Sequence, residues 1–211
     1  MKERLTCKTK FQGGESMRSI DSILKDLNKT YDRAKRFLEL DMEDLNIIRK
    51  NKDFLFKKYD KIISNVVKSL LNNKETIEGV DLTEDKITEL LKRYYTLTIE
   101  EGTDPRLVKK IMKIGLAHIK REIPPSLMIL TMGAFIRETL RNLVSSGKSE
   151  LILPIFKCHF LMLHIMLEAY NKAQLLSLEK ATKISESLYK RLISLKAEEV
   201  CNKLIKYIST E

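Results

Sequence analysis

The stretch that decides the fold is residues 114–125, which read IGLAHIKREIPP. It places His118 near the end of a helix-forming segment that a pair of prolines then terminates. His118 follows Ile111 by seven residues and Gly115 by three, so the three share the inward face of one helix. A glycine one turn before the histidine would let a flat body approach the helix. The pattern suits axial ligation of a planar iron cofactor, and it equally suits a hydrogen-bonded histidine in an ordinary core.

The rest of the chain also has a helical pattern. Only 7 Gly and 4 Pro interrupt 211 residues, and apolar residues recur at spacings of three and four. No stretch alternates apolar and polar residues as a strand would. We therefore predict an all-α protein. The expected helices are 20–37, 42–50, 52–71, 81–102, 105–121, 125–144 and 150–208.

Local signals mark several of these boundaries. Asp81 stands three residues before Glu84, which is a capping-box arrangement, and Gly102 suits the end of the helix that follows. Asp104-Pro105 pairs an N-cap acid with a proline at the first helical position. The last pattern has little interruption, and a helix over 150–208 would be roughly 80–90 Å long. We expect its end to project from the body of the domain.

Composition narrows the function classes. The net charge is +10, but Lys and Arg are interleaved with Asp and Glu along nearly every segment, which favours a solvated surface over nucleic-acid binding. The three cysteines are far apart, so they predict neither a disulfide framework nor a zinc site, and they indicate a reducing cytoplasm. The longest apolar runs, near 127–136 and 160–167, are too short for a membrane span. No phosphate loop or catalytic triad pattern occurs, so we do not expect an enzyme.

Residues 114–125 resemble the proximal segment of globin-coupled sensors and protoglobins. Three further stretches resemble that family: 42–49 (MEDLNIIR), 133–135 (GAF) and 167–170 (LEAY). The similarity covers roughly residues 20–172, and only the segment around His118 is motif-like.

The resemblance implies a globin-like three-on-three helical sandwich with an extra N-terminal helix and a long C-terminal helix. It implies a flexible tail over 1–18, a sensor-globin domain over 19–172 and a helical extension over 173–211. His118 would be the proximal ligand of a b-type haem that binds a diatomic gas. The family pairs through its last two globin helices, so we expect a homodimer in which the apolar run 160–167 contributes to the interface.

Two departures from the family pattern concern the pocket. Val66-Val67 stand where the family has Phe-Tyr on the distal helix, and Leu127-Met128 stand where it often has an aromatic pair. A bound dioxygen would then lack its usual hydrogen-bond donor, although Tyr94 or Tyr95 could supply a hydroxyl. The predicted pocket residues are His118, Gly115, Val67, Ile87, Leu90, Met128 and Tyr94.

These departures keep two other functions open. The first is a haem-free regulatory sensor of the same fold, which would bind a fatty acid or a partner protein. An adaptable apolar cavity would then be lined by Met112, Met128, Met132 and the two valines at 66–67. The second is a purely structural helical adaptor. In the haem-binding alternative, the C-terminal helix would carry the signal, and a signalling protein could be its partner.

Overall fold

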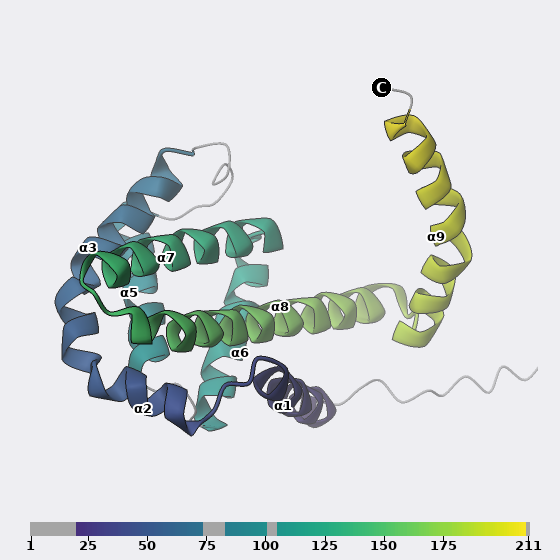
Figure 1. Ribbon diagram of the computed structural model, residues 1–211. Helices are drawn as coiled ribbons and strands as arrows, with labels where there is room; N and C mark the ends of the chain where they lie inside the picture. The colour runs from purple at the N-terminus through teal and green to yellow at the C-terminus, as the bar shows by residue number, and fades with distance from the viewer. Residues whose placement is uncertain (1–19, 74–82, 101–104, 210–211) are drawn as a thin grey trace, which may run out of the picture. The chain divides into compact units, whose positions relative to one another are not determined.

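The computed structural model describes residues 20–73, 83–100 and 105–209 (Figure 1). Helices account for 89% of these residues, and no strand occurs among them, which confirms the all-α prediction. The elements are α1 (Ile20–Phe37), α2 (Met42–Lys50), α3 (Lys52–Leu71), α5 (Glu84–Glu100), α6 (Pro105–Lys120), α7 (Pro125–Ser145), the 3-10 turn η1 (Ser149–Leu151), α8 (Ile152–Thr182) and α9 (Glu186–Ile208).

The chain divides into two compact units, one of which is Asp21–Leu175 and the other of which contains α9. Within the first unit, α3 packs against both α5 and α7. The rings of Phe135 on α7 and His159 on α8 lie with their centroids 6.0 Å apart, which joins these two helices in the core. The core is therefore enclosed by helices that are distant in sequence.

The short helix α2 is fixed at its start and tied to α8. The Asp41 carboxylate accepts hydrogen bonds from the backbone N–H groups of Glu43 at 2.8 Å and Asp44 at 3.0 Å, and Asp44 in turn accepts one from the Asp41 N–H. This is a capping box in which Asp44 stands at the position that Glu or Gln usually occupies. The Asp44 carboxylate also lies 2.9 Å from the ammonium group of Lys157 on α8. The cap thus anchors α2 against the core.

Helices α6 and α8 approach each other at Gly115. A Cβ atom placed on Gly115 would lie 2.5 Å from the carbonyl oxygen of Met166 and 3.2 Å from the Cβ atom of Ala169. The glycine is therefore required by the contact between two helix backbones. This contact lies one helical turn before His118.

The prediction of one uninterrupted C-terminal helix is wrong, because the chain breaks between α8 and α9. Lys183 has a φ of 62°, which is outside the helical region. The Thr182 hydroxyl accepts a hydrogen bond from the Ile184 N–H, and Ser185 caps α9 by accepting one from the Leu188 N–H. None of the α9 residues is buried.

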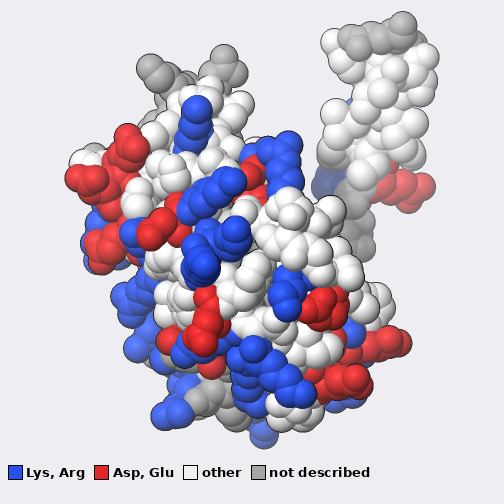
Figure 2. Space-filling view, turned by 60° about the vertical axis from the view of Figure 1, so that its left-hand side comes forward, with Lys and Arg blue, Asp and Glu red and all other residues white. Residues whose placement is uncertain are grey.

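On the face seen in Figure 2, Lys and Arg side chains lie among Asp and Glu side chains. One segment, Ser149–Thr182, is long and apolar enough by composition to cross a membrane, although 56% of its most apolar window is buried inside the protein. A core helix of a globular domain shows the same property, so this is weak support for a span.

Several predictions fall outside the described residues. These are the tail over 1–18, the Asp81 cap, Gly102 and the Asp104 cap. The helices predicted over 42–50, 52–71, 105–121 and 125–144 are confirmed to within one residue at each end.

Candidate functional site

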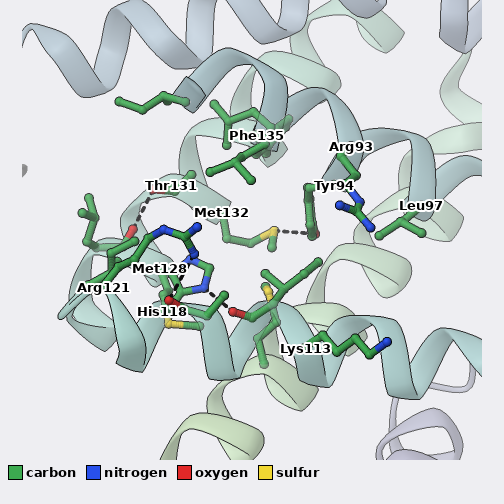
Figure 3. Close-up of a pocket in the computed structure, with 18 of the residues that line it drawn as sticks. Arg93, Tyr94, Leu97, Lys113, His118, Arg121, Met128, Thr131, Met132 and Phe135 are labelled. Atoms are coloured by element: carbon green, nitrogen blue, oxygen red, sulfur yellow. Dashed lines mark hydrogen bonds between the residues drawn. The ribbon is translucent and has the colours of Figure 1, made fainter. Parts of the chain in front are cut away.

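A cavity of about 710 Å³ lies mainly between α5, α6 and α7. Its volume is within the range of cavities that hold cofactors and drug-sized ligands. Figure 3 shows side chains from these helices converging on it, among them His118, Tyr94 and Met132. The walls are mostly apolar; they include Leu70, Leu97, Ile114, Ile123 and Phe135.

His118 stands in the last turn of α6 and lines this cavity. Its Nδ1 atom lies 2.6 Å from the carbonyl oxygen of Ile114, one turn earlier. A carbonyl oxygen can only accept a hydrogen bond, so Nδ1 carries the proton and Nε2 keeps its lone pair. The backbone of α6 therefore holds the imidazole in the tautomer that can bind a metal through Nε2.

The surroundings also keep this imidazole neutral. Burial lowers the pKa of His118 below its ordinary value, and the nearby charge of Arg121 acts in the same direction. The hydrogen bond to Ile114 opposes these effects without overcoming them. Only a neutral imidazole ligates a metal ion, so this environment favours ligation at a lower pH than an exposed histidine would allow.

Cationic side chains stand among the apolar walls. Among the described residues, the cations in the lining are Arg93, Lys110, Lys113 and Arg121, and no Asp or Glu borders the cavity. Figure 3 shows Arg93 and Lys113 beside the apolar residues of α5 and α6. An apolar cavity with cations and no acids suits a ligand that is largely apolar and carries one or more anionic groups.

The sequence model of one family, Protoglobin, matches residues 27–176, which is most of the chain. The chain belongs to the protoglobin family. The predicted resemblance and the globin-like all-α fold are thereby confirmed, and the family is one of haem-binding globins that bind gas. No curated protein matches the chain. The three-on-three layering of the helices stays a prediction.

The cavity of this protoglobin fits haem in three respects. His118 offers an unprotonated Nε2 atom as a ligand, the walls are apolar like the porphyrin face, and the cations suit the two propionate groups. No group of three or more His, Cys, Asp or Glu side chains gathers to hold a metal ion in the described part of the chain. Haem iron needs only one or two protein ligands, because the porphyrin supplies the other four.

Five of the predicted pocket residues line the cavity, namely His118, Ile87, Leu90, Tyr94 and Met128. Two do not, and the structure corrects both. Gly115 faces the backbone of α8 at Met166, so it serves helix packing and is not a pocket wall. Val67 is buried on α3 and borders a smaller hollow that also includes Asp60 and Lys92. Both positions are inward, and helical periodicity alone does not say which neighbour an inward residue meets.

The sequence prediction missed three features of the pocket. Phe135 lines it from α7, and no signal in the sequence singled it out among the inward apolar residues. The cations could have been found, because Lys110, Lys113 and Arg121 recur at spacings that place them along the His118 edge of one helix. His159 was missed as well; it is fully buried on α8 and lies 3.0 Å from the Tyr94 hydroxyl.

Proposed function

We propose that this protoglobin is a sensor that binds a diatomic gas at a b-type haem held by His118 and relays binding through its C-terminal helices. The observation that carries the proposal is the hydrogen bond between His118 Nδ1 and the Ile114 carbonyl, because it leaves Nε2 available inside an apolar cavity. Haem, when bound, supplies the iron that holds a gas reversibly. We propose a binding role without enzymatic activity.

Each part of the cavity has a separate task in this proposal. His118 would bind the iron through Nε2, and the Ile114 carbonyl fixes the orientation of its ring. Ile87, Leu90 and Met128 exclude water from the cavity, which would slow oxidation of a bound haem. The cations of the lining would hold the haem propionate groups.

The route that we propose for the signal begins at the contact between α6 and α8. Gly115 touches the backbone of α8 at Met166, one turn away from His118, and Met166 also lines the cavity. A displacement of His118 would therefore press on a helix that continues to Thr182. Hydrogen exchange of the α8 amides should differ between the haem-loaded protein with and without carbon monoxide. Identical exchange in the two states would refute this route.

We also propose a homodimer that uses α7 and α8. Most of the apolar run 160–167 is buried in the core, but Phe160 is 41% exposed and Phe156, one turn earlier, is 36% exposed. The centroids of their rings lie 4.5 Å apart, and the two rings form an apolar surface on α8. A signalling protein as a partner of the dimer, and a cytoplasmic location, stay predictions.

The same lining supports one other ligand. A fatty acid also combines a long apolar part with one anionic group, and Met128, Met132 and Met166 would adapt to an acyl chain. Haem is favoured over a fatty acid because the chain belongs to a haem-binding family. In addition, a fatty acid contains no metal ion that the His118 Nε2 atom could bind.

An absorption spectrum of the purified full chain, before and after addition of haemin and then with dithionite and carbon monoxide, tests the proposal. We expect a Soret band that shifts when carbon monoxide is added. A chain that forms no stable Soret band after reconstitution would refute haem binding. Mass spectrometry of an organic extract would then show whether a fatty acid is bound instead.

A further inference from the structure

The buried pair of Tyr94 and His159 links α5 to α8 beside the cavity, and Met132 of α7 contacts the same hydroxyl. The Tyr94 hydroxyl, on α5, lies 3.0 Å from Nδ1 of His159 on α8 and 3.2 Å from the sulfur of Met132 on α7. The rings are further held by Phe135, whose centroid lies 5.2 Å from that of Tyr94 and 6.0 Å from that of His159. His159 itself is 0% exposed. The hydroxyl is thus placed by contacts from two separate elements.

The hydrogen-bond partners of Tyr94 and His159 indicate which ring nitrogen of His159 carries the proton. Among the described residues, Nε2 of His159 is buried and has no hydrogen-bond partner. If Nε2 carried the ring proton, a buried N–H would be unsatisfied and the Tyr94 hydroxyl would donate to Nδ1. If Nδ1 carries it, Nδ1 donates to the Tyr94 oxygen and the hydroxyl donates to the Met132 sulfur, so two hydrogen bonds form instead of one. The second arrangement is favoured, because unsatisfied buried N–H groups are rarer than unsatisfied acceptors.

In this arrangement the Tyr94 proton is directed at a weak acceptor. A thioether sulfur accepts hydrogen bonds poorly. A stronger acceptor that enters the cavity can therefore replace the Met132 sulfur as the partner of the Tyr94 hydroxyl at little cost in free energy. The bond from His159 to the Tyr94 oxygen is kept during the exchange, and it polarises the hydroxyl as a donor. Tyr94 and Met132 both line the cavity that His118 lines (Figure 3).

We infer that Tyr94, oriented by His159, is the hydrogen-bond donor that this protein offers to dioxygen in the haem cavity. The inference rests on the proposed haem binding. With haem in the cavity, dioxygen would acquire partial negative charge and would be stabilised by a hydrogen-bond donor, whereas carbon monoxide would be stabilised little. Tyr94 is therefore the residue that determines which gas is retained, and His159 is a positioning residue that acts through it.

The first experiment compares the haem-loaded full chain with its Tyr94→Phe variant, which keeps the ring and removes the hydroxyl. We expect dioxygen to dissociate roughly 10-fold faster or more from the variant, while carbon monoxide dissociation changes much less. Tyr95→Phe is the matched control. Tyr95 is the next residue on α5, and its buried hydroxyl has no partner within the described structure and does not border the cavity.

The second experiment separates orientation by His159 from simple packing. His159→Leu should accelerate dioxygen dissociation as Tyr94→Phe does, and His159→Asn should restore much of the slow rate, because its amide occupies the place of Nδ1. In the carbon monoxide complex, the C–O stretching frequency should rise in Tyr94→Phe and His159→Leu, since both lose an oriented donor. In the haem-free protein, nitrogen NMR should find the proton of His159 on Nδ1.

The outcomes distinguish this inference from the function on which it rests. A normal Soret band together with unchanged dioxygen dissociation in Tyr94→Phe would overturn the role of Tyr94 and leave haem binding intact. A proton found on Nε2 of His159, or equal rates in the Leu and Asn variants, would overturn the positioning role. Absence of any Soret band in the wild-type chain would overturn the proposed function and the inference together.

Discussion

His118 Nδ1 lies 2.6 Å from the carbonyl oxygen of Ile114, and both atoms belong to the last two turns of α6. A hydrogen bond within one helix thus fixes the orientation of the imidazole that faces the cavity. In metal sites, a partner of this kind fixes the tautomer and raises the basicity of the ligating nitrogen.

His118→Ala should abolish stable haem binding, because it removes the axial nitrogen. The measurement is the Soret absorbance that survives gel filtration after reconstitution. His164→Ala is the control, since His164 is half-buried on α8 and does not line the cavity, and it should retain haem as the wild-type chain does. Undiminished haem in His118→Ala would mean that another residue ligates the iron.

Two glycine-to-alanine substitutions should have opposite effects on stability. Gly115→Ala places its Cβ atom 2.5 Å from a backbone oxygen of α8, so we expect destabilisation of about 1–3 kcal/mol. Gly133→Ala meets no atom within 4 Å, and alanine favours the helix by about 0.5–1 kcal/mol. Urea unfolding of the haem-free protein measures both. Equal effects would show that α6 and α8 do not touch at Gly115.

The sequence predicted the helices more completely than it predicted the residues of the site. Pro105 and Pro124-Pro125 mark helix boundaries by local chemistry, and the segments that they delimit were correctly predicted. The break at 183–185 was missed, because Lys183 gives no sign of its left-handed conformation and Ser185 is only a modest cap signal. Local rules of this kind act within a few residues.

Which residues line the pocket depends on how the helices pack against one another, and the apolar periodicity of a single helix does not contain that information. His118 was predicted correctly because it lies in a family motif as well as on the inward face of its helix. Gly115 and Val67 are inward as predicted, yet one meets α8 and the other faces away from the cavity. The pair of Tyr94 and His159 spans 65 residues, and only the folded arrangement brings the two side chains together.

Acid should destabilise the protein through His159. Burial lowers the pKa of His159 from 6.5 to about 4 in the folded state. The unfolded chain therefore takes up a proton first as the pH falls, and stability is lost between about pH 6.5 and pH 4, by about 3 kcal/mol in all. Above pH 7 this group contributes no pH dependence. Urea titrations at several pH values measure the loss, which should be smaller in His159→Asn, where the lowered pKa of His118 still contributes, and retained in His164→Ala.

A negative charge placed on the exposed face of α8 should prevent the proposed dimerisation. Phe160→Glu places a carboxylate on the surface formed with Phe156, and it should convert the proposed dimer to a monomer without unfolding the domain. Sedimentation at several concentrations reports the change, and circular dichroism checks the fold. Leu195→Glu, which replaces an apolar side chain that is 68% exposed on α9, serves as the control. A wild-type monomer at all concentrations would contradict this interface.

The cations of the cavity should determine how firmly haem is held. Lys113→Glu reverses a charge in the lining, so it should repel the propionates and accelerate haem transfer to an acceptor globin by roughly 5-fold or more. Lys109→Glu makes the same change on α6 at an exposed position outside the lining, and it should have little effect. The difference between the two variants should shrink as salt is added, because mobile ions screen partly exposed charges. A salt-independent difference would instead indicate that Lys113 acts through packing of its aliphatic stem, since packing does not respond to ionic strength.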